Sequence, residues 1–414
     1  MGALRFILAM SVAYGHAGDF LGFPLIPGDT AVQCFYAVSG FYMALVLNEK
    51  YRPESSSYFL FISNRFARLF PAYATVLCLT LLFAAVSSPE LPFLARWHSL
   101  PALDWWSAAF LIGSQILMWG QDLYFYLTLK AGALAFWPDF HTAPEPIIPL
   151  LVIPQGWTLG LEFSFYLIAP FIVRRPGAAI VTVLAASLVL RLLLQLAGLS
   201  GDPWSYRFFP SELAVFLLGA LGYCVYRSTS TSQLERTHAS QSSGSRPPCG
   251  ATPDETASRP PPRKGEGSRL FVWRGLEPQL ARMFVLAALC VGAALLINRW
   301  NGLSRVASVA FFVLAVLAIP LLFRATGKWE LDRLLGELSY PIYICHVLVI
   351  WWLDRVLAPG AGVLRGFTIL AITVALSWML YRLVDRPIDA WRQRRFARER
   401  ALVSAAVPAA QPGV

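Results

Sequence analysis

Residues 305–323 read RVASVAFFVLAVLAIPLLF, an apolar run in which Arg305 is the one charged residue. A helix needs about 20 mostly apolar residues to cross the hydrocarbon core of a bilayer. Nine further stretches have a similar length and composition: 3–20, 31–48, 67–87, 156–173, 177–198, 210–226, 282–298, 338–357 and 364–384. The sequence therefore predicts an all-α protein, a polytopic membrane helix bundle with about ten transmembrane helices.

The composition of the whole chain supports this class. Of its 414 residues, 57% are hydrophobic and 14% are charged, whereas soluble domains are about a quarter charged. These values exclude a disordered protein, a collagen-like fibre and a typical cytosolic enzyme. The net charge of +10 does not indicate nucleic acid, because the basic residues lie between apolar runs. The six cysteines show no ligand spacing, so we expect no disulfide framework and no metal site.

The distribution of basic residues predicts the topology. If ten helices cross and the N-terminus is cytoplasmic, the inner segments hold 26 of the 34 Lys and Arg residues. This bias matches the positive-inside rule, with both termini on the cytoplasmic side of the plasma (inner) membrane. Region 105–137 is also apolar but is broken by Gly113, Asp122 and Lys130. Counting it as a crossing would invert every later loop, so we predict a re-entrant or interfacial segment on the outer side.

The sequence also predicts where the membrane part is divided. Residues 228–270 are rich in Ser, Thr, Pro and Gly and cannot bury enough apolar surface to fold. We interpret them as a disordered cytoplasmic linker between 1–227, with seven spans, and 271–386, with three. Residues 387–414 form a basic cytoplasmic tail suited to the anionic inner leaflet, so membrane lipids are expected partners. No internal repeat is visible, unlike in many transporters.

The first apolar stretch places two basic side chains on one face. Arg5 and His16 are eleven residues apart, which in an α-helix is three turns plus about 20°, or about 16 Å along the axis. Ionisable groups inside a membrane are costly and usually functional. We interpret Arg5 as a cationic anchor at the inner surface and His16 as a candidate catalytic imidazole. The alternative is that Arg5 reaches lipid phosphate and His16 is a hydrogen-bonded packing residue.

A pair of arginines lies at the inner end of the third span. Arg65 and Arg68 are three positions apart and therefore face the same way on a helix. Two guanidinium groups at the inner surface suit a phosphate-bearing ligand. Ordinary positive-inside anchoring is the alternative.

The fourth span carries a carboxylate, Glu162, about 9 Å below the outer surface, close to the depth expected for His16. A carboxylate at this depth must be protonated, paired or in a wet cavity. We expect Glu162 to hold the imidazole of His16 in one tautomer. The alternative is a structural ion pair with Arg191 of the fifth span. Four polar residues are candidates for lining a cavity around these groups: Ser39, Tyr166, Arg191 and His346. For His346 a packing role is equally compatible.

Taken together, these segments resemble the acyltransferase-3 family of integral-membrane O-acyltransferases. The resemblance is carried, in family order, by Leu4-Arg5 to His16, Ser39-Gly40-Phe41, Arg65-x-x-Arg68, Trp157-x-Leu159-x-x-Glu162-Phe163-x-Phe165-Tyr166, Leu338-Ser339-Tyr340 to His346, and Asp385-Arg386-Pro387. Several features depart from the family pattern, and one is that Asp385 stands before Arg386-Pro387 where the family more often has Glu. The chain begins almost at Arg5, which is compatible with a truncated start, and the long linker is untypical.

The resemblance implies an acyl-CoA:hydroxyl O-acyltransferase. In that family the basic residue and the histidine of the first span are essential, and these are Arg5 and His16 here. The paired arginines are associated with the acyl-CoA donor, and these are Arg65 and Arg68. The implied reaction moves an acyl group, expected to be acetyl, from cytoplasmic acyl-CoA to a hydroxyl of an extracytoplasmic or lipid-linked carbohydrate. His16 would act as general base, oriented by Glu162, with acyl-CoA as co-substrate and no further cofactor.

The alternative function is a proton-coupled membrane transporter or exporter of a glycan or lipid. Intramembrane Glu, His and Arg residues suit such a protein. The missing repeat and the arginine pair at the inner surface argue against it. A structural membrane scaffold is a third hypothesis, but it leaves Glu162 and His16 without a purpose.

Overall fold

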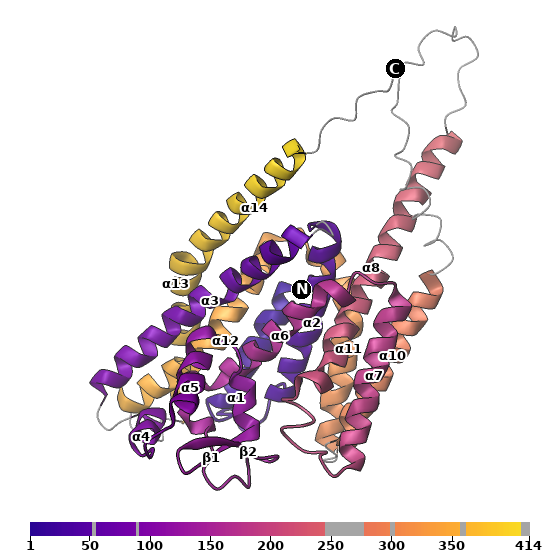
Figure 1. Cartoon of the computed structure of the whole chain (residues 1–414). Helices are drawn as coiled ribbons and strands as arrows, with labels where there is room; N and C mark the ends of the chain where they lie inside the picture. Colours follow the sequence, from indigo (N-terminus) through magenta and orange to yellow (C-terminus); the bar gives the residue numbers. More distant parts are fainter. Residues whose placement is uncertain (52–54, 88–90, 245–276, 299–302, 357–361, 407–414) are drawn as a thin grey trace, which may run out of the picture.

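The computed structural model describes residues 1–51, 55–87, 91–244, 277–298, 303–356 and 362–406 (Figure 1). The described chain is helical almost throughout. Its α-helices are α1 (Gly2–His16), α2 (Gly28–Glu49), α3 (Ser55–Val86), α4 (Pro92–His98), α5 (Trp105–Leu117), α6 (Trp157–Ile172), α7 (Gly177–Leu196), α8 (Phe209–Gly244), α10 (Glu277–Asn298), α11 (Leu303–Thr326), α12 (Glu330–Val356), α13 (Gly362–Leu380) and α14 (Arg386–Ala406). Shorter helical turns are η1 (Gln121–Tyr126), η2 (Ile148–Leu150), η3 (Pro154–Gly156) and the π-helical η4 (Tyr381–Asp385).

Each of the ten predicted apolar stretches falls on one helix. Eight helices are long and apolar enough to cross a membrane by length and composition, and these are α2, α3, α7, α8, α10, α11, α12 and the helix that begins with α13. Helices α1 and α6 have 15 and 16 residues, fewer than a crossing usually needs. The multi-pass bundle is thus supported, while the number of crossings and their direction stay predictions.

Region 105–137 does not form one long helix. It contains α5, η1 and an antiparallel hairpin of β1 (Leu127–Lys130) and β2 (Ala133–Phe136), a local exception to the predicted all-α class. Ala131 and Gly132 make the hairpin turn with positive φ angles, which Gly adopts at no steric cost. Helix α5 buries Ser114 and Gln115 and exposes its Trp and Ile side chains, an arrangement that suits contact with lipid.

The predicted linker begins later than expected. Helix α8 continues to Gly244, so residues 228–244 are helical and the prediction of disorder is wrong for them. Hydroxyl groups in this segment donate back to helix carbonyls, for example Ser230 Oγ to Tyr226 O at 2.8 Å, so they are compatible with the helix. Residues 245–270 lie outside the described residues. Within the predicted tail, α14 is helical, and the final eight positions are likewise not described.

Two helix pairs fix the frame around the site. At the crossing of α2 and α8, a Cβ on Gly40 would lie 1.8 Å from Phe216 O, and one on Gly219 would lie 1.7 Å from Ala37 O. Only glycine permits this approach of two backbones, as in other membrane helix pairs. The second pair is α1 with α12, where Asp332 accepts hydrogen bonds from the N–H groups of Gly2 and Ala3 at 2.8 and 2.9 Å.

The two ends of the bundle differ. Helices α4 and α5 and the hairpin gather at one end, whereas α8 and α14 extend at the other (Figure 1). The first group carries exposed aromatic side chains such as Trp105 and Trp106, and α14 carries exposed arginines. Which of the two ends faces the cytoplasm stays a prediction from the charge distribution.

Candidate active site

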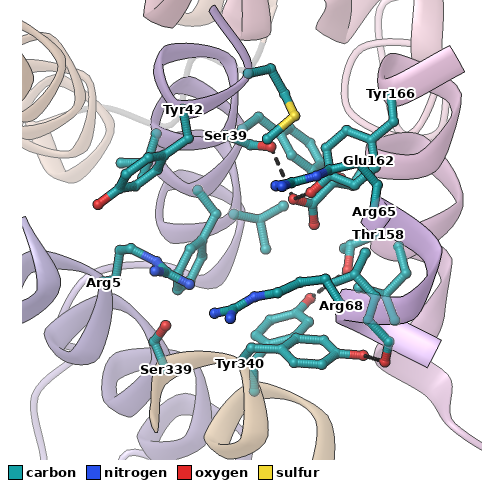
Figure 2. A pocket seen from close by; sticks show the side chains of 18 of the residues that line it. Arg5, Ser39, Tyr42, Arg65, Arg68, Thr158, Glu162, Tyr166, Ser339 and Tyr340 are labelled. Carbon is teal, nitrogen blue, oxygen red and sulfur yellow. Dashed lines mark hydrogen bonds between the residues drawn. The ribbon is translucent and has the colours of Figure 1, made fainter. Parts of the chain in front are cut away.

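A cavity of about 270 Å³ lies between α1, α2, α3, α6, α12 and α14. The guanidinium groups of Arg5, Arg65 and Arg68 point into the same space from two helices (Figure 2). Apolar α2 side chains form one wall. The polar side chains of the lining are Arg5, Tyr36, Ser39, Tyr42, Arg65, Arg68, Thr158, Glu162, Tyr166, Glu337, Ser339, Tyr340, Tyr343 and Arg392.

Arg68 is held by two carboxylates. Its Nη2 lies 2.5 Å from Glu337 Oε2 and its Nη1 lies 2.8 Å from Asp389 Oδ2. Asp389 also pairs with Arg392, at 3.0 Å. These four charges cancel, so Arg68 contributes little net charge to the cavity.

Arg5 and Arg65 differ from Arg68 in this respect. Neither makes a hydrogen bond or ion pair with any residue in the described part of the chain, and Arg65 Nε is buried without an acceptor. The guanidinium of Arg65 lies over the Phe61 ring, 5.7 Å from its centroid. Unpaired guanidinium groups in a partly buried cavity favour binding of an anion.

Glu162 faces these arginines across the cavity (Figure 2). Its Oε1 accepts hydrogen bonds from Ser39 Oγ at 2.9 Å and from the hydroxyl of Tyr166, one turn further along α6. The expectation that Glu162 orients His16 is wrong in this structure. The ring of His16 contacts His346 of α12 instead.

The partner of His16 is His346. The His16 Nδ1 and His346 Nε2 atoms are 2.7 Å apart, and the two rings are stacked with centroids 5.0 Å apart. His346 is fully buried, while His16 is exposed at the end of α1. Neither residue lines the cavity. Tyr343 lines its wall, with a ring centroid 6.1 Å from that of His346 and a hydroxyl that accepts from Thr158 Oγ1 at 3.1 Å.

Arg191 does not line this cavity, contrary to expectation. It is almost fully buried and pairs with Glu212 at 2.8 Å, and Glu212 also accepts a hydrogen bond from Gln33 at 3.1 Å. The alternative pairing of Arg191 with Glu162 is therefore wrong as well. A buried carboxylate and guanidinium satisfy each other where they face each other, and α7 and α8 provide that contact.

The segment that precedes α6 positions the outer part of the site. Asp122 of η1 approaches Gly160, where a Cβ would lie 2.6 Å from Asp122 Oδ1. Burial raises the pKa of Asp122 to about 6, because the charged carboxylate loses its hydration. Arg207 adds a second restraint, since its guanidinium lies 4.0 Å from the Phe125 ring centroid and 4.2 Å from that of Trp157.

Comparison with known proteins identifies the family. The sequence profile of the acyltransferase domain of the acyltransferase-3 family matches residues 1–382. The chain belongs to the acyltransferase-3 family. It is 25% identical over 214 residues to the O-acetyltransferase OatA of several Staphylococcus aureus strains, an alignment that covers 50% of this chain and 30% of OatA. It is 33% identical over 76 residues to Protein 2 in picA locus of Rhizobium radiobacter, covering 18% of this chain and 40% of that protein. No solved structure matches.

In this member of the acyltransferase-3 family, six of the residues singled out from the sequence meet in one cavity: Arg5, Ser39, Arg65, Arg68, Glu162 and Tyr166. Three residues of the charged network escaped sequence reasoning, namely Glu337, Asp389 and Arg392. Glu337 directly precedes the motif Leu338-Ser339-Tyr340, and Asp389 lies two positions after the motif Asp385-Arg386-Pro387. Acidic residues at the inner ends of spans, where basic residues dominate, are the signal that would have revealed them.

Proposed function

We propose that this chain is an integral-membrane O-acyltransferase. It moves an acyl group, expected to be acetyl, from cytoplasmic acyl-CoA to a hydroxyl of an extracytoplasmic or lipid-linked carbohydrate. The observation that carries the proposal is the cavity in which Arg5 and Arg65 have no anionic partner among the described residues. Family membership and the name of the OatA relatives support the reaction class.

The cavity suits the donor. Arg5 and Arg65 bind the phosphate groups of acyl-CoA, and Arg68 is kept in place by Glu337 and Asp389. The pantetheine arm carries no net charge and extends past Glu162 toward the outer half of the bundle. Tyr343 lines the cavity and its ring centroid lies 6.1 Å from that of His346, so the thioester reaches the two imidazoles past this side chain.

His16 acts as the general base. It takes the proton from the acceptor hydroxyl while the hydroxyl oxygen attacks the thioester carbonyl. The new C–O ester bond forms, the C–S bond breaks, and the CoA thiolate takes up the proton that His16 received, which regenerates the neutral imidazole as CoA leaves toward the cytoplasm. Exclusion of water by the apolar bundle limits hydrolysis of the thioester.

Ligand binding separates this function from transport. We expect CoA and acetyl-CoA to raise the melting temperature of the purified protein, since a ligand that binds only the folded state stabilises it. Stabilisation by a glycan or lipid alone, with no response to CoA, would favour a transporter.

Mass spectrometry of cell-surface glycans, with and without the gene and with His16→Ala at matched membrane abundance, identifies the acceptor. Retained O-acylation in the variant would remove His16 from the mechanism.

A further inference from the structure

The pair of imidazoles lies beyond the donor cavity and is built from two parallel helices. Asp332 bonds to the N–H of Gly2 near the inner end of α1, and His16 meets His346 at its other end. Both pairs are separated by 330 residues in sequence, so α1 and α12 keep one register over about 21 Å. The contact between the rings is therefore set by the whole length of this helix pair.

The hydrogen-bond partners assign the protons of both rings. His346 Nδ1 lies 3.3 Å from the carbonyl oxygen of Ile342, which can only accept, so the proton of neutral His346 is on Nδ1. Its Nε2 then carries a lone pair and accepts from His16 Nδ1 at 2.7 Å. The proton of neutral His16 is consequently on Nδ1, and its Nε2 carries the lone pair.

This second nitrogen is available for chemistry. No residue in the described part of the chain bonds to His16 Nε2, and the side chain is exposed at the end of α1. His346, in contrast, is fully buried and cannot reach an acceptor entering from outside.

We propose that His346 is a positioning residue that fixes His16 in the tautomer with a basic Nε2. The proposal rests on the proposed role of His16 as general base. A neutral imidazole performs the orienting task that a carboxylate performs in many hydrolases, at a smaller desolvation cost inside a membrane. The carbonyl of Ile342 holds the His346 ring in place through Nδ1, because this carbonyl belongs to the backbone of α12.

Two substitutions of similar polarity provide the test. In His346→Gln, the side-chain Oε1 can occupy the position of Nε2 and accept from His16. In His346→Asn, the side chain is one methylene shorter and does not reach it. The assay follows transfer of labelled acetyl from acetyl-CoA to endogenous acceptor in membrane vesicles, at matched protein abundance, with kcat and the KM for acetyl-CoA measured separately.

We expect His346→Gln to keep at least a tenth of the wild-type kcat, and His346→Asn and His346→Leu to lose about 10²–10⁴-fold. The KM for acetyl-CoA should stay within about twofold in all three, because the arginine cavity is untouched. Equal activity of the Gln and Asn variants would overturn the proposal, as would full activity of His346→Leu. His16→Ala distinguishes this failure from failure of the proposed function. Full activity of His16→Ala would show that His16 is not the general base. An inactive His16→Ala together with a fully active His346→Leu would reject only the positioning role of His346.

Discussion

Arg65 and Arg68 are one helical turn apart on α3, yet their surroundings differ. Arg68 bonds to Glu337 and Asp389, whereas Arg65 lies over the Phe61 ring and makes no ion pair with the residues that the structure describes. The motif suggests two equivalent ligand-binding cations, but the acidic partners of Arg68 come from α12 and α14, far away in sequence. We therefore assign ligand binding mainly to Arg65 and support of the cavity mainly to Arg68.

Alanine substitutions should separate these two roles. Arg68→Ala leaves the partly buried carboxylate of Glu337 unpaired and leaves Asp389 with Arg392 alone, so we expect a loss of about 1.5–3 kcal/mol in the free energy of unfolding, seen as a lower melting temperature. Arg65→Ala should leave the melting temperature nearly unchanged and weaken acetyl-CoA binding roughly 10–100-fold. Thermal melting with and without acetyl-CoA measures both. An unstable Arg65→Ala that binds normally would contradict the assignment.

Asp122 predicts a dependence of stability on pH. Its pKa of about 6 in the folded protein lies above that of an unfolded Asp, so the folded state binds the extra proton between about pH 4 and 6. The charged carboxylate therefore destabilises the fold above pH 6, and this cost disappears as the pH falls toward 4. We expect Asp122→Asn to be more stable than wild type by up to about 3 kcal/mol at pH 7.5.

The measurement is the difference in melting temperature between Asp122→Asn and wild type from pH 7.5 to 4.5. This difference in melting temperature should become smaller as the pH falls. A difference that is constant over this range would show that the carboxyl does not titrate as inferred.

Glycine contacts determine how the central helices assemble. Gly219 of α8 lies against Ala37 O, so an added methyl group would meet backbone and not a flexible side chain. We expect Gly219→Ala to lower the free energy of unfolding by at least about 1–3 kcal/mol. Gly113→Ala in α5 is the matched control, because nothing lies within 4 Å of its added Cβ, and it should be neutral or slightly stabilising. Equal melting temperatures for the two variants would argue against this packing.

The helices were predictable from the sequence, but which helices and side chains contact each other was not. Length and hydropathy identify a spanning helix because the bilayer imposes both. The same pattern gives the depth of a polar residue and not the direction in which it faces. The sequence predicts a similar depth for Glu162 and His16, yet Glu162 bonds to Ser39 of α2, and His16 bonds to His346 of α12. Arg191 likewise pairs with Glu212 of the adjacent α8, because hydropathy does not indicate which neighbouring helix a side chain faces.

Local polar sequence was also misleading at one boundary. The Ser- and Thr-rich end of α8 is poor in large apolar residues, which predicts disorder, but α8 continues through it, and Ser228 and Ser230 donate hydrogen bonds to helix carbonyls. Composition reports whether a segment can form a core, and it does not report where a helix ends beyond the core.

For the whole molecule, charge predicts orientation. The hairpin with Lys130 and the helix α14 lie at opposite ends of the bundle (Figure 1). With both termini inside, a C-terminal green fluorescent protein fusion should fluoresce, and alkaline phosphatase inserted after Lys130 should be active outside the cytoplasm. An inactive phosphatase at this position, with the fusion abundant in the membrane, would reverse the predicted topology.

The central claim is that donor and acceptor reach the site from opposite faces. Inside-out membrane vesicles expose the arginine cavity to added acetyl-CoA, and right-side-out vesicles do not. With acetyl-CoA labelled in its acetyl group, the account predicts base-labile labelled acceptor in inside-out vesicles, none in sealed right-side-out vesicles, and at least a hundredfold less with His16→Ala. Equal labelling in both kinds of sealed vesicle, or full labelling with His16→Ala, would contradict it.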